Sequence, residues 1–388
     1  MSEAVVKLVV DLGNSETRVA TILDKGDGAG SQIDIAVLDN RFSSIPQNNV
    51  DEYVDHVNKP ENAGKSSIFW LSGNIYCSGE LASVEFAQTS YRPSALEKKY
   101  ESIASKVALM NAFRYGYLKA SEFFGVSVDE LNPKWIVTVL LPPEDVALGA
   151  GKMAEMVKKI ERIDFLTPSL RKRVLVDRVT ILPEGFCAFI GVLYKRKGVI
   201  RSDYKYLREG GTNTLICDIG AGTTDFLLIH DGRVVETSKF TKGIGGNNIT
   251  RIVQKKLRGQ GISLSDSMIQ KGCLEGKIRV GSKDREIYME IEEAKKEVSR
   301  NLVDSVQEFF ESTMIPVNSI NYVLIVGGGA AGSDNPYITP ISTYIKQYMR
   351  NIAPNVEEVE LPVVEMFGGA ERISPRMLNI IGATVLSE

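Results

Sequence analysis

Apolar residues along this chain fall into short runs of strand length and longer stretches with helical spacing. The short runs predict strands at residues 5–10, 19–23, 33–37, 68–71, 75–77, 135–141, 174–182, 214–219, 226–229 and 322–326. Apolar positions that recur every three or four residues predict helices near 103–117, 249–257 and 291–310, and a short helix follows Pro375. Because strands and helices alternate along the sequence, the chain is predicted to be an α/β protein.

The pattern changes within residues 214–231, where an apolar run, a glycine-rich turn and a second apolar run follow one another. Glycines in such a turn allow backbone N–H groups to point at an anion, and Thr223 and Thr224 add hydroxyl donors. Asp218, at the lip of the turn, is well placed for a hydrated Mg²⁺ ion. The segment therefore predicts a phosphate-binding loop, with an ordinary tight β-hairpin as the alternative.

A second copy of this pattern lies near the N-terminus, at residues 9–20, and aligns with the first without gaps. The matched pairs are Asp11 with Asp218, Gly13 with Gly220, Ser15 with Gly222, and Thr17 with Thr224. Two copies so far apart predict a duplicated domain whose two phosphate loops face each other across a cleft.

The composition limits the classes of function. At 388 residues the chain is long enough for two domains, and its 43% hydrophobic and 24% charged residues are ordinary for a globular protein. A net charge of −3 provides no basic field to recruit nucleic acid or an anionic membrane. No secretory leader or membrane-spanning run is visible. The four cysteines lack CxxC spacing and there are only two histidines, which favours a reducing cytoplasm and argues against structural zinc or a histidine-dependent triad.

Several polar stretches are predicted to lie at the surface. Residues 40–66 are interpreted as a small flexible subdomain or an exposed loop, and residues 196–208 as a charged connector. Two short basic clusters are interpreted as solvated side chains, namely Arg171, Lys172, Arg173, Lys195, Arg196 and Lys197.

Two further segments are candidates for chemistry. Pro183-Glu184-Gly185 joins a strand to an apolar helix, and Glu184 could position a water for attack on a terminal phosphate. Alternatively, Pro183 is the first helical residue and Glu184 only favours the helix dipole. Residues 327–332 satisfy GxGxxG after a strand, but no acidic residue follows at the spacing of a ribose contact. A glycine turn against which a nucleoside lies fits this loop better, and a purely structural turn is the alternative.

As a set, these segments resemble the motifs of the actin-like ATPase superfamily and appear in that family's order. The resemblance covers the two phosphate motifs, the two connecting motifs and the adenosine motif, at residues 11–17, 218–225, 183–185, 378–383 and 326–331. Within the superfamily the chain most resembles the bacterial ParM/Alp plasmid-segregation actin-like proteins, in its length and in residues 137–142. Residues 292–299 also resemble the helix that related chaperones use to hold adenosine.

The resemblance implies an actin-like fold, with two duplicated RNase H-like domains flanking a nucleotide cleft. Domain I would span 1–190, with the insertion at about 40–66 and the C-terminal helix 374–388 packed back on it, and domain II would span 191–373. Glu184 and Asp218 would be catalytic, and Asp11 and Asp218 would hold Mg²⁺ through water. The residues expected to bind ATP/ADP, or GTP, are Asp11, Gly13, Asn14, Ser15, Thr17, Gly220, Gly222, Thr223, Thr224, Gly245, Gly246, Glu292, Lys295, Gly327, Gly328, Gly329 and Ala330.

The resemblance also implies a Mg²⁺-dependent hydrolase whose activity is coupled to filament assembly in the cytoplasm, for plasmid DNA segregation. Its partners would be further copies of itself and an adaptor protein bound to centromere-like DNA, without direct contact to nucleic acid or membrane. The alternatives are a non-polymerising regulatory ATPase or assembly chaperone, and a sugar-kinase-like phosphotransferase. Pelleting with and without ATP separates the filament-forming ATPase from both alternatives.

Overall fold

The computed structural model describes residues 4–24, 31–57, 59, 66–71, 73–86, 88–91, 97–166, 169–312, 315–331, 335–364 and 371–388. The chain divides into two compact units. Unit 1 comprises Met1–Glu184 with Ala383–Glu388, and unit 2 comprises Gly185–Gly382. Among the described residues, no helix combines the length and the apolar character needed to cross a membrane.

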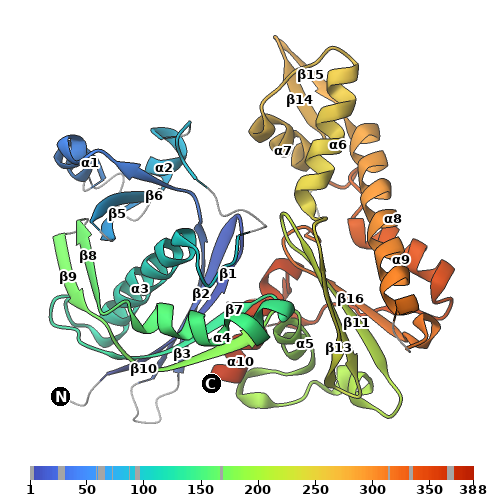
Figure 1. Ribbon diagram of the computed structural model, residues 1–388, viewed down its shortest axis with the longest axis horizontal. Coiled ribbons are helices and arrows are strands. Elements are labelled where there is room, and N and C mark those ends of the chain that lie inside the picture. The colour runs from blue at the N-terminus through green and yellow to red at the C-terminus, as the bar shows by residue number, and fades with distance from the viewer. Residues whose placement is uncertain are drawn as a thin grey trace. The chain divides into compact units, whose positions relative to one another are not determined.

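The main sheet of unit 1 has the strand order β10-β7-β1-β2-β3 (Figure 1). Its strands are β1 (Val5–Leu12), β2 (Glu16–Asp24), β3 (Ser31–Asp39), β7 (Lys134–Leu141) and β10 (Leu175–Pro183). Strands β1, β7 and β10 are parallel, whereas β2 is antiparallel to both β1 and β3. Helix α3 (Ile103–Phe124) packs against β1, β2 and β3, and helix α4 (Pro143–Lys158) packs against β7 and β10.

The packing of α3 on this sheet follows from its sequence. Ser102 caps the helix by accepting a hydrogen bond from the backbone N–H of Ala104 at 3.0 Å. On β7, the fully buried Trp135 meets the rings of Phe113 and Tyr117 edge to face, with centroid separations of 5.1 and 4.9 Å. These aromatic contacts fix α3 above the parallel strands.

A second sheet of unit 1 has the order β4-β6-β5-β8-β9. The strands of this sheet are β4 (Phe42–Ile45), β5 (Ser66–Leu71), β6 (Asn74–Gly79), β8 (Arg162–Leu166) and β9 (Ser169–Arg173). The helices in the same part of the chain are α1 (Val50–Val57) and α2 (Glu80–Val84). Strand β4 and helix α1 lie in the stretch predicted as a flexible subdomain or exposed loop. Ile45, Val57, Ile68 and Ile75 are buried in a hydrophobic cluster of their own. The exposed-loop alternative is therefore wrong for the described residues, while residues 58 and 60–65 lie outside the described part of the chain.

Lys172 on β9 corrects another surface prediction. Only 4% of this residue is exposed, and its ammonium donates to the Asp129 carbonyl oxygen at 3.0 Å. The same ammonium lies 5.9 Å from the centroid of the Tyr117 ring, and burial lowers the pKa of Lys172. The sequence pattern did not reveal this burial because the carbonyl and the ring that receive the ammonium come from distant segments.

Unit 2 repeats the main sheet of unit 1 strand for strand, in the order β13-β12-β11-β16-β17. Its strands are β11 (Asn213–Ile219), β12 (Thr224–His230), β13 (Arg233–Lys242), β16 (Tyr322–Val326) and β17 (Glu357–Glu358). Strands β11, β16 and β17 are parallel, and β12 is antiparallel to β11 and β13. The duplication that the repeat at residues 9–20 predicted is thus present in the two sheets.

The helices of unit 2 surround a core that α8 (Tyr288–Ser312) runs through. Helices α6 (Gly246–Gly259) and α9 (Ile341–Ile352) pack on α8. Helix α6 begins three residues before the predicted start at residue 249. The remaining elements are α5 (Phe186–Leu193), α7 (Asp266–Glu275), β14 (Lys277–Val280), β15 (Lys283–Glu286), β18 (Val363–Val364) and β19 (Glu371–Arg372). The predicted connector at 196–208 forms short 3₁₀ helices, Arg196–Gly198 and Ser202–Arg208.

The last helix, α10 (Leu378–Ser387), begins in unit 2 and ends in unit 1. Within unit 2 it crosses α5 at a glycine pair, because Gly191 lies against the Leu378 carbonyl and Gly382 against the Cys187 carbonyl. At its other end, Lys7 of β1 donates to the Ser387 carbonyl oxygen at 2.9 Å.

Candidate functional site

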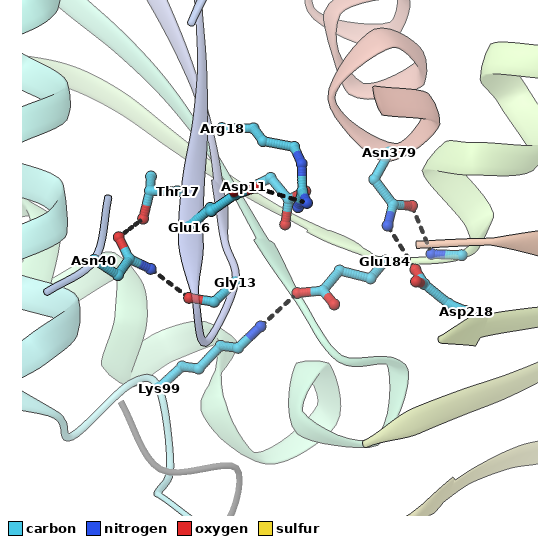
Figure 2. Close-up of polar contacts among 11 residues, drawn as sticks. Asp11, Gly13, Glu16, Thr17, Arg18, Asn40, Lys99, Glu184, Asp218 and Asn379 are labelled. Atoms are coloured by element: carbon cyan, nitrogen blue, oxygen red, sulfur yellow. Dashed lines mark hydrogen bonds and ion pairs between the residues drawn. The ribbon is translucent and has the colours of Figure 1, made fainter. Parts of the chain in front are cut away.

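In unit 1, the first predicted phosphate loop (loop 1, residues 13–17) is the turn between β1 and β2. Asn40, which follows β3, holds this turn closed (Figure 2). Its side-chain carbonyl accepts from the Thr17 hydroxyl at 2.5 Å, and its amide nitrogen donates to the Gly13 carbonyl oxygen. Its backbone N–H donates to the Ser15 carbonyl oxygen at 3.2 Å. Gly13, Asn14, Ser15 and Thr17 are therefore brought together as predicted, in a turn whose shape is fixed from outside the motif.

Asp11, the predicted metal ligand of this loop, already has a cationic neighbour. Arg18 is directly opposite Asp11 on β2 and donates to its carboxylate at 3.2 Å (Figure 2). The guanidinium also lies 3.6 Å from Glu16, and only 11% of the Arg18 side chain is exposed. Loop 1 thus presents a buried, charge-compensated pair in which a guanidinium suited to phosphate lies beside the glycine turn.

In unit 2, the second predicted phosphate loop (loop 2, residues 220–224) is the turn between β11 and β12. Gly220 donates its N–H to the Thr223 carbonyl oxygen at 2.8 Å, which closes the turn around Gly222. The Thr224 hydroxyl donates to the Ile244 carbonyl oxygen at 2.6 Å. The side chain of Thr224 therefore ties this turn to a second glycine cluster, residues 243–246, as that of Thr17 ties loop 1 to Asn40.

The second glycine cluster forms the N-terminus of α6 and packs directly on this turn. Gly246 N–H donates to the Gly220 carbonyl oxygen at 3.0 Å, and Asn247 N–H donates to the Ala221 carbonyl oxygen at 2.7 Å. A Cβ atom added at Gly245 would lie 2.7 Å from the Gly220 carbonyl oxygen. Only glycine permits this contact between two backbones.

The third glycine turn, after β16, packs on the end of β11. Gly329 N–H donates to the Ile219 carbonyl oxygen at 2.7 Å, and a Cβ at Gly329 would lie 3.0 Å from the Gly220 carbonyl oxygen. Gly328 and Ala330 belong to the same turn, whereas Gly332 of the GxGxxG match lies outside the described residues. The predicted residues 220–224, 245–246 and 327–330 therefore converge in unit 2. Their glycine backbones contact one another directly, an arrangement that suits the binding of phosphate groups by backbone N–H groups.

Asp218, at the end of β11, lies directly opposite Asp225 on β12. Both residues are buried, with exposed fractions of 5% and 6%. Paired residues on antiparallel strands share one face of the sheet, and like charges placed this way repel each other. A cation is therefore favoured beside this pair, which suits Asp218 to a metal ion. The Thr241 hydroxyl donates to Asp225 at 2.5 Å.

Asn379 on α10 connects Asp218 to the start of α5 (Figure 2). Its amide nitrogen donates to the Asp218 carboxylate at 2.5 Å, and its carbonyl oxygen accepts from Gly185 N–H at 2.9 Å. Both ends of the amide are thus used, and only 6% of the residue is exposed. The second connecting motif therefore orients the predicted metal ligand and the first connecting motif together.

Glu184 follows β10 at the carboxyl edge of the unit 1 sheet. Asp11 and Leu182 both pair with Leu140 on β7, so Asp11 and Glu184 come to the same edge of this sheet. The alternative in which Pro183 is the first helical residue is wrong, because Pro183 ends β10 and α5 begins at Phe186. Glu184 instead accepts from the Lys99 ammonium at 2.7 Å (Figure 2).

Glu292 and Lys295 on α8 make contacts with the segment before α9. Lys295 donates to the Thr339 carbonyl oxygen at 2.5 Å, and Glu292 accepts from Thr339 N–H at 3.0 Å and from the Tyr344 hydroxyl. Burial lowers the pKa of Lys295. One turn further along α8, Ser299 is fully buried, and its hydroxyl has no hydrogen-bond partner in the part of the chain that is described. These polar groups remain candidates for contact with a base.

The sequence motifs did not single out Arg18, Asn40, Lys99, Asp225 or Asn379 as site residues. Arg18, Asp225 and Asn379 lie inside or next to the motifs and were within reach of sequence reasoning. Asn40 and Lys99 gave no local signal, because their roles depend on long-range contacts.

The chain is similar to known proteins in part of its sequence and in its fold. Residues 216–334 match the family model for the C-terminal part of MreB-like archaeal actin homologues. No curated protein sequence matches the chain. Similar solved structures include a ParM from a 15-stranded Clostridium botulinum filament, with 19% identity, a TM-score of 0.66 and 99% coverage of both chains.

Two further structures are similar over nearly the whole chain. The actin-like protein Alp7A has 16% identity and a TM-score of 0.67, covering 98% of this chain and 95% of its own. Ta0583, an archaeal actin homologue solved in complex with ADP, has 15% identity and a TM-score of 0.62, covering 98% of this chain and 97% of its own. The predicted actin-like α/β fold is thereby confirmed. The chain therefore has an actin-like fold similar to that of ParM, and its residues 216–334 match the model of the C-terminal part of MreB-like archaeal actin homologues.

Proposed function

We propose that this protein is a Mg²⁺-dependent ATPase, with GTP as the alternative substrate, that polymerises in a nucleotide-dependent manner. The observation that carries the proposal is the duplicated hairpin, in which a buried aspartate precedes a glycine turn at the end of a buried strand in each unit. The similarity to ParM and to an archaeal actin homologue bound to ADP supports the choice of ligand.

In unit 1, backbone N–H and hydroxyl groups of residues 13–17 would bind phosphate, and in unit 2 those of residues 220–224 would do so. Arg18 adds a guanidinium beside loop 1, and the N-terminus of α6 adds the positive end of a helix dipole beside loop 2. The turn at 327–330 would receive the nucleoside, with Glu292 and Lys295 as the nearest candidates for selecting the base. The proposed roles of residues 220–224 and 327–330 are supported by the close backbone contacts that Gly245 and Gly329 make with residues 219–221, which only glycine allows.

When bound, Mg²⁺ neutralises phosphate charge and orients the terminal phosphate. Asp218 is better suited than Asp11 to hold it through water, because Asp218 faces another carboxylate whereas Asp11 faces Arg18. Across the described ranges, no cluster of three His, Cys, Asp or Glu side chains could hold a metal ion. The remaining ligands would be water and phosphate oxygens, as is usual for Mg²⁺ at nucleotide sites.

Glu184 is the residue proposed to orient the attacking water. Its carboxylate is fixed at the carboxyl edge of the unit 1 sheet, beside the turn that would hold the phosphates. Hydrolysis would be slow in the monomer and faster in a filament, because assembly fixes that water for attack.

The cellular role proposed is plasmid DNA segregation by cytoplasmic filaments of this chain. The adaptor protein would carry the centromere-like DNA, since a net charge of −3 offers no field for direct nucleic-acid or membrane contact. The similar ParM from Clostridium botulinum was solved as a filament, which supports self-association as the output of the nucleotide cycle.

The test combines phosphate release, nucleotide binding and pelleting for the wild type, Glu184→Ala and the matched control Glu101→Ala, which removes an exposed carboxylate. We expect ATP-dependent pelleting of the wild type, and an approximately 10²- to 10⁴-fold slower phosphate release by Glu184→Ala. That variant should still bind nucleotide and should form persistent filaments, whereas Glu101→Ala should behave as wild type.

Each part of the proposal can fail separately. Loss of nucleotide binding in Glu184→Ala would exclude the role of Glu184 in orienting water. Phosphate release without pelleting would point to a non-polymerising ATPase, and ADP release that depends on an added sugar would point to a phosphotransferase.

A further inference from the structure

Lys99 lies outside all the nucleotide motifs, yet its ammonium contacts the proposed water-orienting carboxylate. The distance from Lys99 Nζ to Glu184 Oε1 is 2.7 Å, and the two side chains are only 14% and 11% exposed (Figure 2). Exposed ion pairs contribute little to the stability of a fold, because water screens their charges and two long side chains must be ordered. This pair is largely screened from water, so its charges interact more strongly than those of a surface pair.

The backbone around Lys99 is anchored on its C-terminal side. Tyr100 is buried against Gly149 of α4, which packs this segment on the helix. The neighbouring ion pair between Glu101 and Lys152 of α4 is 56% and 60% exposed and adds little to this packing. Ser102 then caps α3. The ammonium of Lys99 is therefore presented from a segment fixed to two helices of unit 1.

The backbone of Glu184 is fixed independently of Lys99. Glu184 N–H donates to the Leu141 carbonyl oxygen at 2.8 Å, which continues the β10–β7 pairing by one residue. Gly185 then turns the chain with φ of 69°, a conformation that favours glycine. The sheet thus determines where the Glu184 side chain starts, and the contact with Lys99 restricts where its carboxylate ends.

We propose that Lys99 is a positioning residue for hydrolysis, which holds the Glu184 carboxylate in the orientation that aligns the attacking water. This inference rests on the proposed function of Glu184 as the water-orienting group. A displacement of about 1 Å in such a group can slow a reaction about 10²-fold without changing substrate affinity. Removal of the ammonium should therefore affect the catalytic step and leave nucleotide binding intact.

The experiment measures single-turnover ATP hydrolysis and nucleotide affinity in full-length protein under polymerising conditions. The variants are Lys99→Gln, Lys99→Arg, Glu184→Gln and the double variant, with Lys152→Gln as the matched control that breaks the neighbouring ion pair. We expect Lys99→Gln to hydrolyse about 10- to 100-fold more slowly with unchanged affinity. Lys99→Arg, which keeps the charge, should recover most of the rate, and Lys152→Gln should match the wild type.

The double variant tests whether the two residues act as one unit. If Lys99 acts through Glu184, then Lys99→Gln adds no further loss to Glu184→Gln. A wild-type or faster rate in Lys99→Gln, an equal loss of rate and affinity, or no recovery with Lys99→Arg would overturn the inference. If Glu184→Gln itself hydrolyses ATP at the wild-type rate, the proposed role of Glu184 fails instead, which distinguishes the two failures. Should Lys99→Gln not fold, Lys99→Arg and the Glu184→Gln background still decide the question.

Discussion

Replacement of Gly382 by alanine tests the crossing of α5 and α10 in unit 2. A Cβ at this position would overlap the Cys187 carbonyl, and it would also lie 2.7 Å from the Gly191 backbone nitrogen. Both opposing groups are backbone, so no side-chain rotation relieves the overlap. The two helices must separate if the variant is to fold.

The size of the effect follows from two opposing terms. Overpacking of a fixed core contact costs about 3 kcal/mol at the upper end of its usual range, and alanine in place of glycine in a helix recovers about 1 kcal/mol. We therefore expect a net loss of about 2 kcal/mol in the free energy of unfolding. For a unit of this size, that corresponds to a Tm about 4–8 °C lower.

The matched control is Gly151→Ala on α4, where a Cβ would meet no atom within 4 Å. It should gain about 1 kcal/mol from helix propensity alone. Thermal unfolding followed by circular dichroism measures both variants. Equal stabilisation by the two substitutions would refute the close crossing of α5 and α10.

Two further variants test the site and the core. Asn379→Ala removes the donor to Asp218 and the acceptor for the buried Gly185 N–H. It should lower the free energy of unfolding in urea by about 1–3 kcal/mol, the cost of a buried N–H left without an acceptor. A negligible loss would show that the bridge contributes nothing. Burial raises the pKa of the Cys77 thiol from 9.0 to about 12. The neutral thiol therefore contributes its full share to the free energy of unfolding below pH 9, and this contribution is lost as the pH rises toward 12. Between these values the free energy of unfolding of Cys77→Val should fall less steeply than that of the wild type, by about 1.4 kcal/mol per pH unit, and parallel pH curves would contradict this.

The periodicity of the sequence predicted the central strands well, because each is an apolar run bounded by turn-forming glycine or proline residues. The run at 135–141 became β7, and the runs on either side of Gly220 became β11 and β12. Two surface predictions were wrong where long-range contacts prevailed over local polarity, namely the exposed-loop alternative for residues 40–66 and the solvated Lys172. Residues 40–66 contain β4 and α1 around a small core, and Lys172 is buried on carbonyl groups that no local pattern reveals.

The sequence alone determined the duplicated sheets and the glycine turns, since apolar period, glycine content and the gapless repeat are local properties of the chain. The positions of Asp11, Asp218 and Glu184 at strand ends followed from the same pattern. Only the tertiary structure decided what surrounds these carboxylates, namely Arg18 beside Asp11, Asn379 and Asp225 beside Asp218, and Lys99 beside Glu184. The physical reason is that a hydrogen bond or ion pair depends on distance in space, and the fold brings together residues as far apart in sequence as Asp218 and Asn379.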